Sequence, residues 1–281
     1  MSSIAVISDI HGNLEALKSV LEDIKKRNIE KIICLGDIIA KGSNQKECLE
    51  LIKENCQIVL RGNCDEFFSL DIDINKFNET EQKRIIWNHG KITDEDREYL
   101  LNLPFSHEMY ISGRLVRFFH ATPEKINGFV GNIDKIEKSY SLFLPSQNTE
   151  SQNKADVVVY GHIHTAYLQR IYNRTIINTG SVGNAIDVIR NDEKDGNNNF
   201  TTLANYLIIN GNLNSTNEKD SISFELVSIP YDKDKEIKSN IDNIEFDDYK
   251  TEITTGKYRD MEKINNSFKE RGININEIWF N

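Results

Sequence analysis

Residues 4–24 read IAVISDIHGNLEALKSVLEDI, and this stretch decides the expected fold. It opens with an apolar run from Ile4 to Ser8, which is typical of a buried strand. A polar segment, Asp9 to Asn13, follows at once. The next apolar residues recur with helical spacing, at Leu14, Leu17, Val20, Leu21 and Ile24. Strand, polar turn and helix in this order predict the first part of a β-α-β unit.

The same alternation continues to residue 60. Residues 31–35 form a second apolar run, a helical stretch surrounds Cys48 to Ile52, and residues 58–60 form a third run. Two strand-helix-strand repeats predict a parallel or mixed sheet covered by helices. Further strands are expected at residues 115–119, 157–160, 168–172, 175–178, 203–209 and 222–229.

Residues 66–104 interrupt this alternation. A helix is expected at residues 80–87, and a second one follows a variant of the capping box at Thr93 to Asp96 and runs through Leu101. From residue 233 onward the chain is charged and expected to be helical, most clearly at residues 258–268. We therefore predict one domain over residues 1–232 with a helical excursion at about 66–104. A charged helical tail, residues 233–281, would pack on or near it.

The chain has 281 residues with 44 acidic and 34 basic side chains, which gives a formal net charge of −10. No basic stripe that binds phosphate backbones is visible, so duplex nucleic acid is not an expected partner. The first residues lack a secretory pattern, and no apolar stretch reaches the ~20 residues of a membrane span. The four cysteines form no C-x-x-C pair. We therefore expect a cytoplasmic protein with free thiols and no membrane partner.

Five short polar segments stand out because each directly follows an expected strand. They are Asp9–Asn13, Gly36-Asp37, Gly62–Asp65, His120 and Gly161–His164. In open α/β sheets, ligands bind beyond the carboxyl ends of the strands. Polar residues at five such ends can therefore converge on one site.

These segments hold seven side chains that can bind metals: Asp9, His11, Asp37, Asn63, His120, His162 and His164. Carboxylate and imidazole ligands suit Mn, Fe, Zn, Co or Ni. Seven ligands with one shared carboxylate fit two ions, which in such sites lie ~3.5–4 Å apart. Taken singly, each segment has a structural explanation as a helix cap, a turn or a packed histidine. All five explanations would have to hold together, so we favour the metal site. His89 and His107 lie outside the segments, and we expect them to have structural roles only.

The order of these motifs, D-x-H, G-D, G-N-x-[D/E], H and G-H-x-H, resembles the calcineurin-like metallophosphoesterase superfamily over residues 3–232. It is most similar to the small bacterial branch that includes phosphodiesterases and asymmetric dinucleoside tetraphosphatase-like enzymes. The segment NTGSVG at residues 178–183 resembles the Gly-Ser turn of that branch. The resemblance implies an α/β fold with four layers, α/β/β/α, in which two mixed sheets pack face to face between flanking helices.

The resemblance also implies a role for each ligand. The first metal ion would be held by Asp9, His11 and His164. The second would be held by Asn63, His120 and His162. Asp37 would bridge the two ions, for which Mn or Fe is favoured. A hydroxide that bridges the ions would attack the phosphorus atom.

Two positions depart from the family pattern. Cys64 stands where many relatives have a histidine that helps to protonate the leaving group. A thiol, with a reference pKa of about 8.5, is a weaker proton donor at neutral pH, so we expect a preference for good leaving groups. A role for Cys64 as a small space-filling residue is equally open. Lys41 stands where protein phosphatases of the superfamily have an arginine, and it is a point donor that lacks the fork geometry. Lys41 and Asn13 are the candidate substrate contacts.

We therefore predict a two-metal phosphoesterase that hydrolyses a phosphodiester or a nucleotide phosphoanhydride. Its partner would be a small phosphorylated or nucleotide substrate. Two alternatives stay open: a phosphomonoesterase or protein phosphatase of the same superfamily, and a non-catalytic metal-binding scaffold. No feature of the sequence indicates an oligomeric state.

Overall fold

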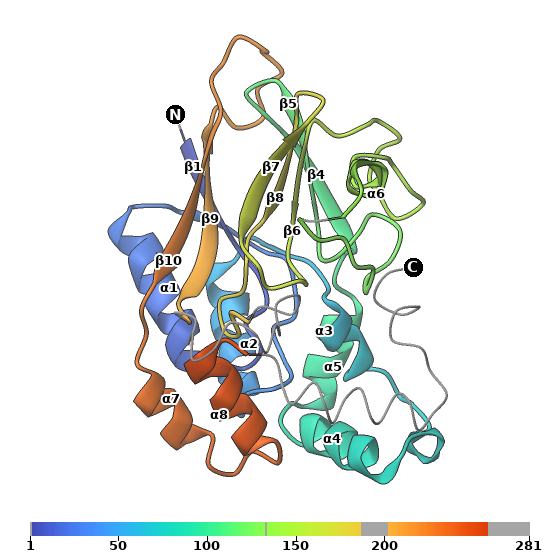
Figure 1. Ribbon diagram of the computed structural model, residues 1–281, viewed down its shortest axis with the longest axis vertical. Coiled ribbons are helices and arrows are strands. Elements are labelled where there is room, and N and C mark those ends of the chain that lie inside the picture. The colour runs from blue at the N-terminus through green and yellow to red at the C-terminus, as the bar shows by residue number, and fades with distance from the viewer. Residues whose placement is uncertain (1, 133, 187–201, 258–281) are drawn as a thin grey trace.

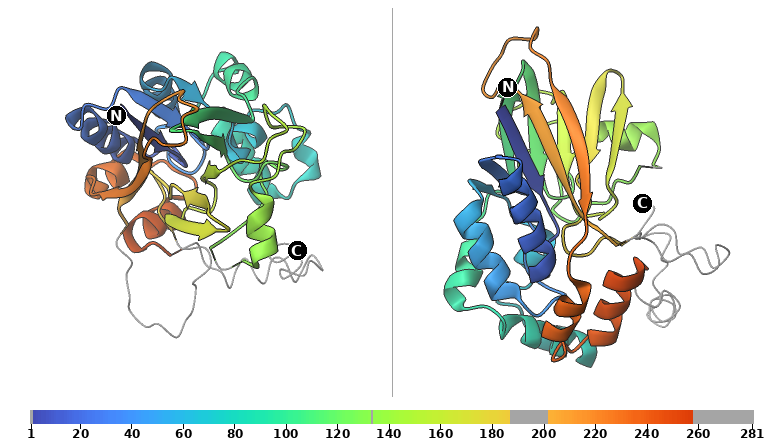
Figure 2. Two further views of the ribbon diagram at one scale, coloured as in Figure 1. Left: turned by 90° about the horizontal axis from the view of Figure 1, so that it is seen from above. Right: turned by 90° about the vertical axis from the view of Figure 1, so that its left-hand side faces the viewer.

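The computed structural model describes residues 2–132, 134–186 and 202–257. Two five-stranded sheets pack face to face, and helices lie on their outer faces (Figure 1, Figure 2). The first sheet has the strand order β10-β9-β1-β2-β3, and the second has the order β4-β5-β6-β8-β7. This arrangement confirms the predicted four-layer sandwich.

Both sheets are mixed. The strands of the first sheet are β1 Ser2–Ile7, β2 Lys31–Cys34, β3 Ile58–Val59, β9 Ala204–Gly211 and β10 Ser223–Ile229. Here β1, β2 and β3 run parallel, whereas β9 lies antiparallel between β1 and β10. The strands of the second sheet are β4 Ser106–Ile111, β5 Arg114–Phe119, β6 Val157–Tyr160, β7 Tyr167–Ile171 and β8 Arg174–Asn178. In it β5, β6 and β8 run parallel, and β4 and β7 are antiparallel edge strands.

Successive residues of β1 enter different layers of the core, because side chains alternate along a strand. Ile4 and Val6 are fully buried between the sheets, in one cluster with Phe118 of β5. Ala5 and Ile7 belong to the cluster under the helices. The central strand is therefore apolar on both faces, which explains its unbroken hydrophobic run.

The helices of the first sheet's outer face are α1 Leu14–Lys26 and α2 Gln45–Asn55. The excursion contains α3 Asn63–Phe67, the short 3₁₀ helix η1 Ile74–Lys76, α4 Glu79–His89 and α5 Asp94–Leu101. Helices α4 and α5 confirm the two that were predicted there. The capping box of α5 is also confirmed, since Asp96 N donates to Thr93 Oγ1 (3.2 Å) and Thr93 N donates to Asp96 Oδ2 (3.1 Å).

Four elements were not predicted individually: α3, η1, β4 and the short helix α6 Ile136–Ser141. The C-terminal region forms α7 Lys233–Ser239 and α8 Phe246–Thr255, which confirms helical structure over that part of the tail. The helix predicted at residues 258–268 lies outside the described residues. Helix α7 contacts the start of α1, where Lys235 Nζ lies 2.9 Å from Glu15 Oε2. Figure 1 shows α3, α4, α5, α7 and α8 at the end of the sandwich where β1 finishes.

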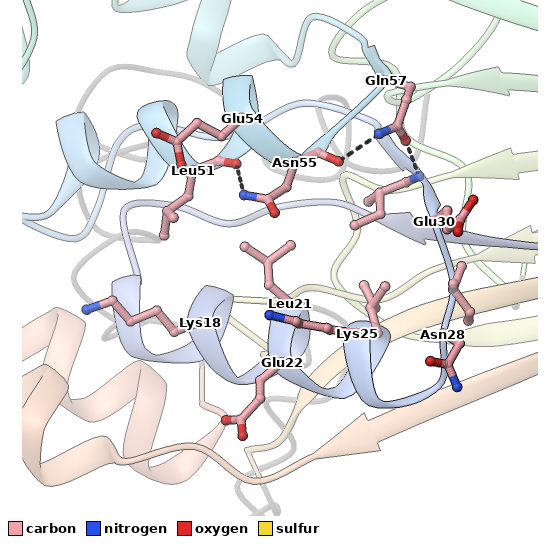
Figure 3. A pocket seen from close by; sticks show the side chains of 13 residues that line it. Lys18, Leu21, Glu22, Lys25, Asn28, Glu30, Leu51, Glu54, Asn55 and Gln57 are labelled. Carbon is pink, nitrogen blue, oxygen red and sulfur yellow. Dashed lines mark hydrogen bonds between the residues drawn. The ribbon is translucent and has the colours of Figure 1, made fainter.

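A groove between α1 and α2 lies toward the opposite end, near the beginnings of β2 and β3 (Figure 3). Its polar groups bond to one another: Ile32 N donates to Gln57 Oε1, Gln57 Nε2 to Asn55 O, and Asn55 Nδ2 to Leu51 O. Lys18, Lys25, Glu22 and Glu54 lie at its edges. The groove contains none of the residues in the five polar segments. Among the described residues, no helix is both long and apolar enough to cross a membrane.

Candidate metal centre

The polar segments meet at one end of the sandwich, because β1, β2 and β3 are parallel neighbours in one sheet and β5 and β6 are parallel neighbours in the other. The hydrogen bond from His162 N to Asp9 Oδ2 shows that the carboxyl ends of the two sets lie side by side across the seam between the sheets. His11 Nε2 lies 3.1 Å from His164 Nε2. His120 Nε2 lies 3.0 Å from Asn63 Oδ1. The rings of His120 and His162 have centroids 5.2 Å apart. The structure thus brings all seven predicted ligands together.

Asp37 stands between two halves of this cluster. One carboxylate oxygen, Oδ2, lies 3.7 Å from His11 Nε2, and the other, Oδ1, lies 3.5 Å from His120 Nε2. Burial alone raises the pKa of Asp37, but His120, His11 and His162 outweigh burial and hold that pKa well below its usual range. The carboxylate is therefore ionised and faces both halves.

Asp9 completes the half that contains His11 and His164. Its Oδ1 lies 3.3 Å from His164 Nε2 and 3.9 Å from His11 Nε2. Burial raises the pKa of Asp9, yet the nearby His164 outweighs burial and lowers it to about 2. The second oxygen, Oδ2, accepts from the backbone N–H of His162 at 2.9 Å. This bond links the end of β1 to the end of β6.

Three of the histidines are oriented by backbone carbonyl groups. Nδ1 lies 3.2 Å from Ile39 O in His11, 3.0 Å from Leu35 O in His120 and 2.5 Å from Asn184 O in His164. A carbonyl oxygen can only accept, so each Nδ1 carries the hydrogen and each Nε2 faces the site. Histidines that bind metals through Nε2 have this arrangement of their outer nitrogen.

The residues fit divalent cations. Asp9 Oδ1 is buried and has no hydrogen-bond partner. Burial lowers the pKa of His11 to about 3 and that of His162 to about 4, so both rings are neutral. The two ionised carboxylates, Asp9 and Asp37, leave negative charge that a protonated His120 balances only in part, and uncompensated charge is costly in a protein interior. A bound cation satisfies both the charge and the orphaned oxygen, and ligand atoms of Asp9, His11 and His164 lie within 4.8 Å of one another.

His120 behaves differently from its neighbours. Burial lowers its pKa, but the Asp37 carboxylate outweighs burial and raises the pKa to about 9. Without metal, His120 therefore carries a second proton, which a metal ion at Nε2 would displace. Ligand atoms of Asp9, Asp37 and His120 also lie within 4.8 Å of one another.

The backbone at the site is strained. Five of the seven ligands have left-handed φ values: Asp9 (55°), His11 (51°), Asp37 (52°), His162 (68°) and His164 (62°). For residues other than glycine this conformation costs about 1–2 kcal/mol each. Such strain persists where the surrounding structure imposes it, and it clusters at functional sites. The sharp turns point consecutive ligands, such as His162 and His164, into one centre.

Two glycines allow the segments to approach one another. A Cβ on Gly62 would lie 2.1 Å from Asp37 N and 2.2 Å from Asp37 Oδ1. A Cβ on Gly161 would lie 2.0 Å from Ser8 Oγ and 2.5 Å from Asp9 Oδ2. Neither position has room for a methyl group, which explains why glycine precedes a ligand in both motifs.

Two supporting residues were missed. Asp65 is fully buried; its Oδ1 accepts from Ile38 N (2.9 Å) and its Oδ2 from Gly62 N (3.0 Å), which holds the loop after Asp37 against α3. Burial and then Asp37 raise the pKa of Asp65 to about 7. The acidic last position of the third motif is a signal that could have identified it. Asn184, whose carbonyl orients His164, follows directly after the quoted NTGSVG turn.

The structure places the remaining candidates beside the cluster. Cys64 N donates to Asp37 Oδ1 at 2.8 Å, and burial and Asp37 raise the pKa of its thiol well above the usual value, so the thiol is neutral. Asn13 caps α1 through Ala16 N (3.1 Å) and donates to Gly183 O (2.7 Å). The side chain of Asn13 would have to break these two hydrogen bonds before it could contact a substrate.

Lys41 is tied to other residues of the fold. Its Nζ donates to Asn184 Oδ1 at 2.9 Å and lies 3.1 Å from Glu252 Oε2. The side chain of Lys41 is only 10% exposed. Contact between Lys41 and a substrate stays a prediction, and it requires the amine to leave these partners.

Comparison with known proteins agrees with this geometry. Residues 2–196 match the family model described as the calcineurin-like phosphoesterase superfamily domain, and the chain belongs to this superfamily. It is accordingly a metal-dependent phosphoester hydrolase. An uncharacterized protein of Methanocaldococcus jannaschii is 37% identical over 216 residues, which cover 69% of this chain and 84% of that relative.

Two solved structures share the fold. A metallophosphoesterase from Sphaerobacter thermophilus matches with a TM-score of 0.64 and 21% identity, over 91% of this chain and 99% of that one. A hypothetical protein from Pyrococcus horikoshii matches with a TM-score of 0.69 and 17% identity, over 92% of this chain and 100% of that one.

Proposed function

We propose that this chain hydrolyses a phosphodiester or a nucleotide phosphoanhydride with the help of two divalent metal ions. The observation that carries the proposal is the position of Asp37, whose two carboxylate oxygens face different halves of one ligand cluster. One half would hold an ion through Asp9, His11 and His164. The other half would hold an ion through Asn63, His120 and His162. When bound, two such ions supply an activated water and stabilise charge on the attacking and leaving oxygens.

The chain's own residues prepare the site for an anionic substrate. The positive charge of two divalent ions would exceed the negative charge of the ionised Asp9 and Asp37. A phosphate group would therefore be attracted to the site although the whole chain is acidic. The overall charge of −10 disfavours duplex nucleic acid and favours a small phosphorylated or nucleotide substrate. The carboxylate and imidazole ligands suit Mn or Fe.

Cys64 supports the choice of substrate class. Its neutral thiol adjoins Asp37, where a stronger acid would protonate the leaving group. A missing general acid costs about 10²–10⁴-fold in rate, and the cost is smallest when the leaving group is already stable as an anion. Phosphoanhydrides and aryl esters have such leaving groups. Helices α3 to α5 and α7 to α8 flank the site end of the sandwich and supply the surface that would select among them (Figure 2).

Turnover of three compounds by the manganese-loaded full chain tests the proposal: a bis-aryl phosphate, a mono-aryl phosphate and diadenosine tetraphosphate. We expect the first and third to be hydrolysed faster than the second. Asp37→Ala should reduce turnover by more than the about 10–100-fold that loss of an outer partner of a ligand costs, because Asp37 is itself a proposed ligand of both ions. Asp94→Ala, which removes an aspartate that is 92% exposed on α5, should leave turnover unchanged.

Other outcomes would favour the alternatives. Fastest turnover of the mono-aryl phosphate would identify a phosphomonoesterase. Two bound ions without turnover of any compound would favour a metal-binding scaffold. Equal turnover by the wild-type chain and Asp37→Ala would refute the two-metal site.

A further inference from the structure

A buried polar network joins the C-terminal helix α8 to the candidate metal centre. Its outer member, Glu252, is 1% exposed. A single carboxylate oxygen of Glu252, Oε2, accepts from Asn184 Nδ2 at 2.9 Å and from Lys41 Nζ at 3.1 Å. A buried carboxylate is stable only when it is paired and hydrogen-bonded, so these contacts hold α8 in one position.

Asn184 is the centre of the network. It is fully buried, and each of its polar groups has a partner. Its side-chain Oδ1 accepts from Lys41 Nζ at 2.9 Å, its Nδ2 donates to Glu252, and its N–H donates to Ser181 Oγ at 2.8 Å. Its carbonyl oxygen accepts from His164 Nδ1 at 2.5 Å. The side-chain bonds of Asn184 therefore set the place of the carbonyl that orients the His164 ring.

The same segment of chain reaches the loop after Asp37. Asn243 Nδ2, in the connection between α7 and α8, donates to Lys41 O at 2.6 Å. Asn240 Oδ1 accepts from Ser43 N at 2.7 Å. Helices α7 and α8 and the chain between them thus contact the loop after Asp37 and the turn that contains Asn184. Figure 1 shows both helices at that end of the sandwich. They lie beyond residue 196, where the match to the family model ends.

We propose that Glu252 is a positioning residue for the half of the metal centre formed by Asp9, His11 and His164. It acts through Asn184, which fixes the ring of His164. The inference rests on the proposed two-metal function.

The other half of the centre provides an internal control. There the ring of His120 is oriented by Leu35 O at the end of β2. Leu35 belongs to the core between the two sheets, where it packs with Leu60 and Phe118. Disturbing Glu252 should therefore weaken one ion and leave the other bound as before. A general loosening of the fold would weaken both.

Calorimetric titration of the metal-stripped full chain with Mn²⁺ tests this, because it measures affinity without activity. The wild-type chain should bind two ions. In Glu252→Ala we expect one of them to bind about 10–100-fold more weakly, the usual effect of losing an outer partner of a metal-binding histidine. Glu252→Gln should stay close to wild type, because an amide oxygen can accept from both Lys41 and Asn184. Asp247→Ala, an exposed acidic residue of the same helix, is the matched control and should change nothing.

Thermal unfolding of each metal-stripped variant establishes that it is folded. If Glu252→Ala does not fold, Asn184→Ala takes its place, since it keeps the backbone carbonyl and removes the side-chain bonds; the same selective loss is expected. Two ions bound with wild-type affinity in the folded variant would overturn the inference while the proposed function stands. Equal weakening of both ions, or a Gln variant as weak as the Ala variant, would overturn it as well. A wild-type chain that binds fewer than two ions would instead overturn the proposed function.

Discussion

Replacement of Gly62 by alanine is the sharpest test of how the site is assembled. The backbone of Gly62 has φ −94° and ψ 168°, which any residue adopts, so the substitution adds no backbone strain. Its whole effect comes from the new methyl group, which would lie 2.1 Å from Asp37 N and 2.2 Å from Asp37 Oδ1.

The size of the effect follows from these distances. Real Cβ contacts are essentially never shorter than 3.0 Å, so the Asp37 segment and Gly62 must separate by at least 0.9 Å, the difference between 3.0 and 2.1 Å. A displacement near 1 Å of a positioned group costs about 10²-fold in rate. Forcing a methyl group into packed surroundings costs about 1–3 kcal/mol in the free energy of unfolding.

The assays are kcat/KM for a bis-aryl phosphate with Mn²⁺, calorimetric Mn²⁺ affinity, and thermal unfolding. Gly90→Ala is the matched control. A Cβ at Gly90 would lie 3.5 Å from its nearest neighbours, Ile86 O and Trp87 O, which is an ordinary contact distance, and φ is −71°. It should leave activity unchanged. If Gly62→Ala kept wild-type activity and metal affinity, close approach of the third motif to Asp37 could not be the reason for the glycine.

Three further predictions follow from the site and its supports. Cys64→His should raise turnover of an alkyl phosphodiester relative to an aryl one, by up to about 10²–10⁴-fold, and an unchanged alkyl-to-aryl ratio would refute a proton-donor position there. For Asp96, burial raises the pKa but hydrogen bonds from Lys46, Lys53 and Thr93 outweigh burial and lower it. Its stabilising effect is therefore present above its unfolded pKa of about 3.9 and is lost as pH falls through the lower folded value. The Tm of the wild-type chain should accordingly fall more steeply below pH 4 than that of Asp96→Asn, and parallel curves would contradict this. Chelation of the metal should abolish turnover and lower the Tm, and Mn²⁺ should restore both. The Tm should respond because an ion at about 100 times its Kd stabilises the folded state by about 2.7 kcal/mol. A Tm that does not respond to metal would count against a site formed only in the folded chain.

Most of the site could be predicted from local sequence. Each ligand lies in a segment that directly follows a strand, and parallel strands bring their carboxyl ends to one edge of a sheet. The order of strands and ligands along the sequence therefore predicts that the ligands meet in the fold. Strand β4 was missed because its residues, Ser106 to Ile111, do not alternate cleanly between buried and exposed. Helix α6 has only six residues and no side-chain cap to mark its start.

The supporting network could not be predicted in the same way. Glu252 is one of 44 acidic residues, and its sequence neighbours do not distinguish it from the solvated ones. Its burial depends on Lys41 and Asn184, which are far from it in the chain. The tight bonds of Asn13 and Lys41 are likewise tertiary, so the sequence pattern suggested substrate contacts where the structure shows internal partners.

The position of β1 between β2 and β9 has a consequence for synthesis on the ribosome. The last of the seven ligands, His164, emerges well before β9, which begins at Ala204. During that interval the nascent chain holds a complete set of metal ligands while one edge of β1 has no strand to pair with. Open strand edges recruit other chains. The time between synthesis of His164 and synthesis of β9 therefore sets how long the edge of β1 is open to pairing with other chains. This time does not depend on whether the metal centre is occupied.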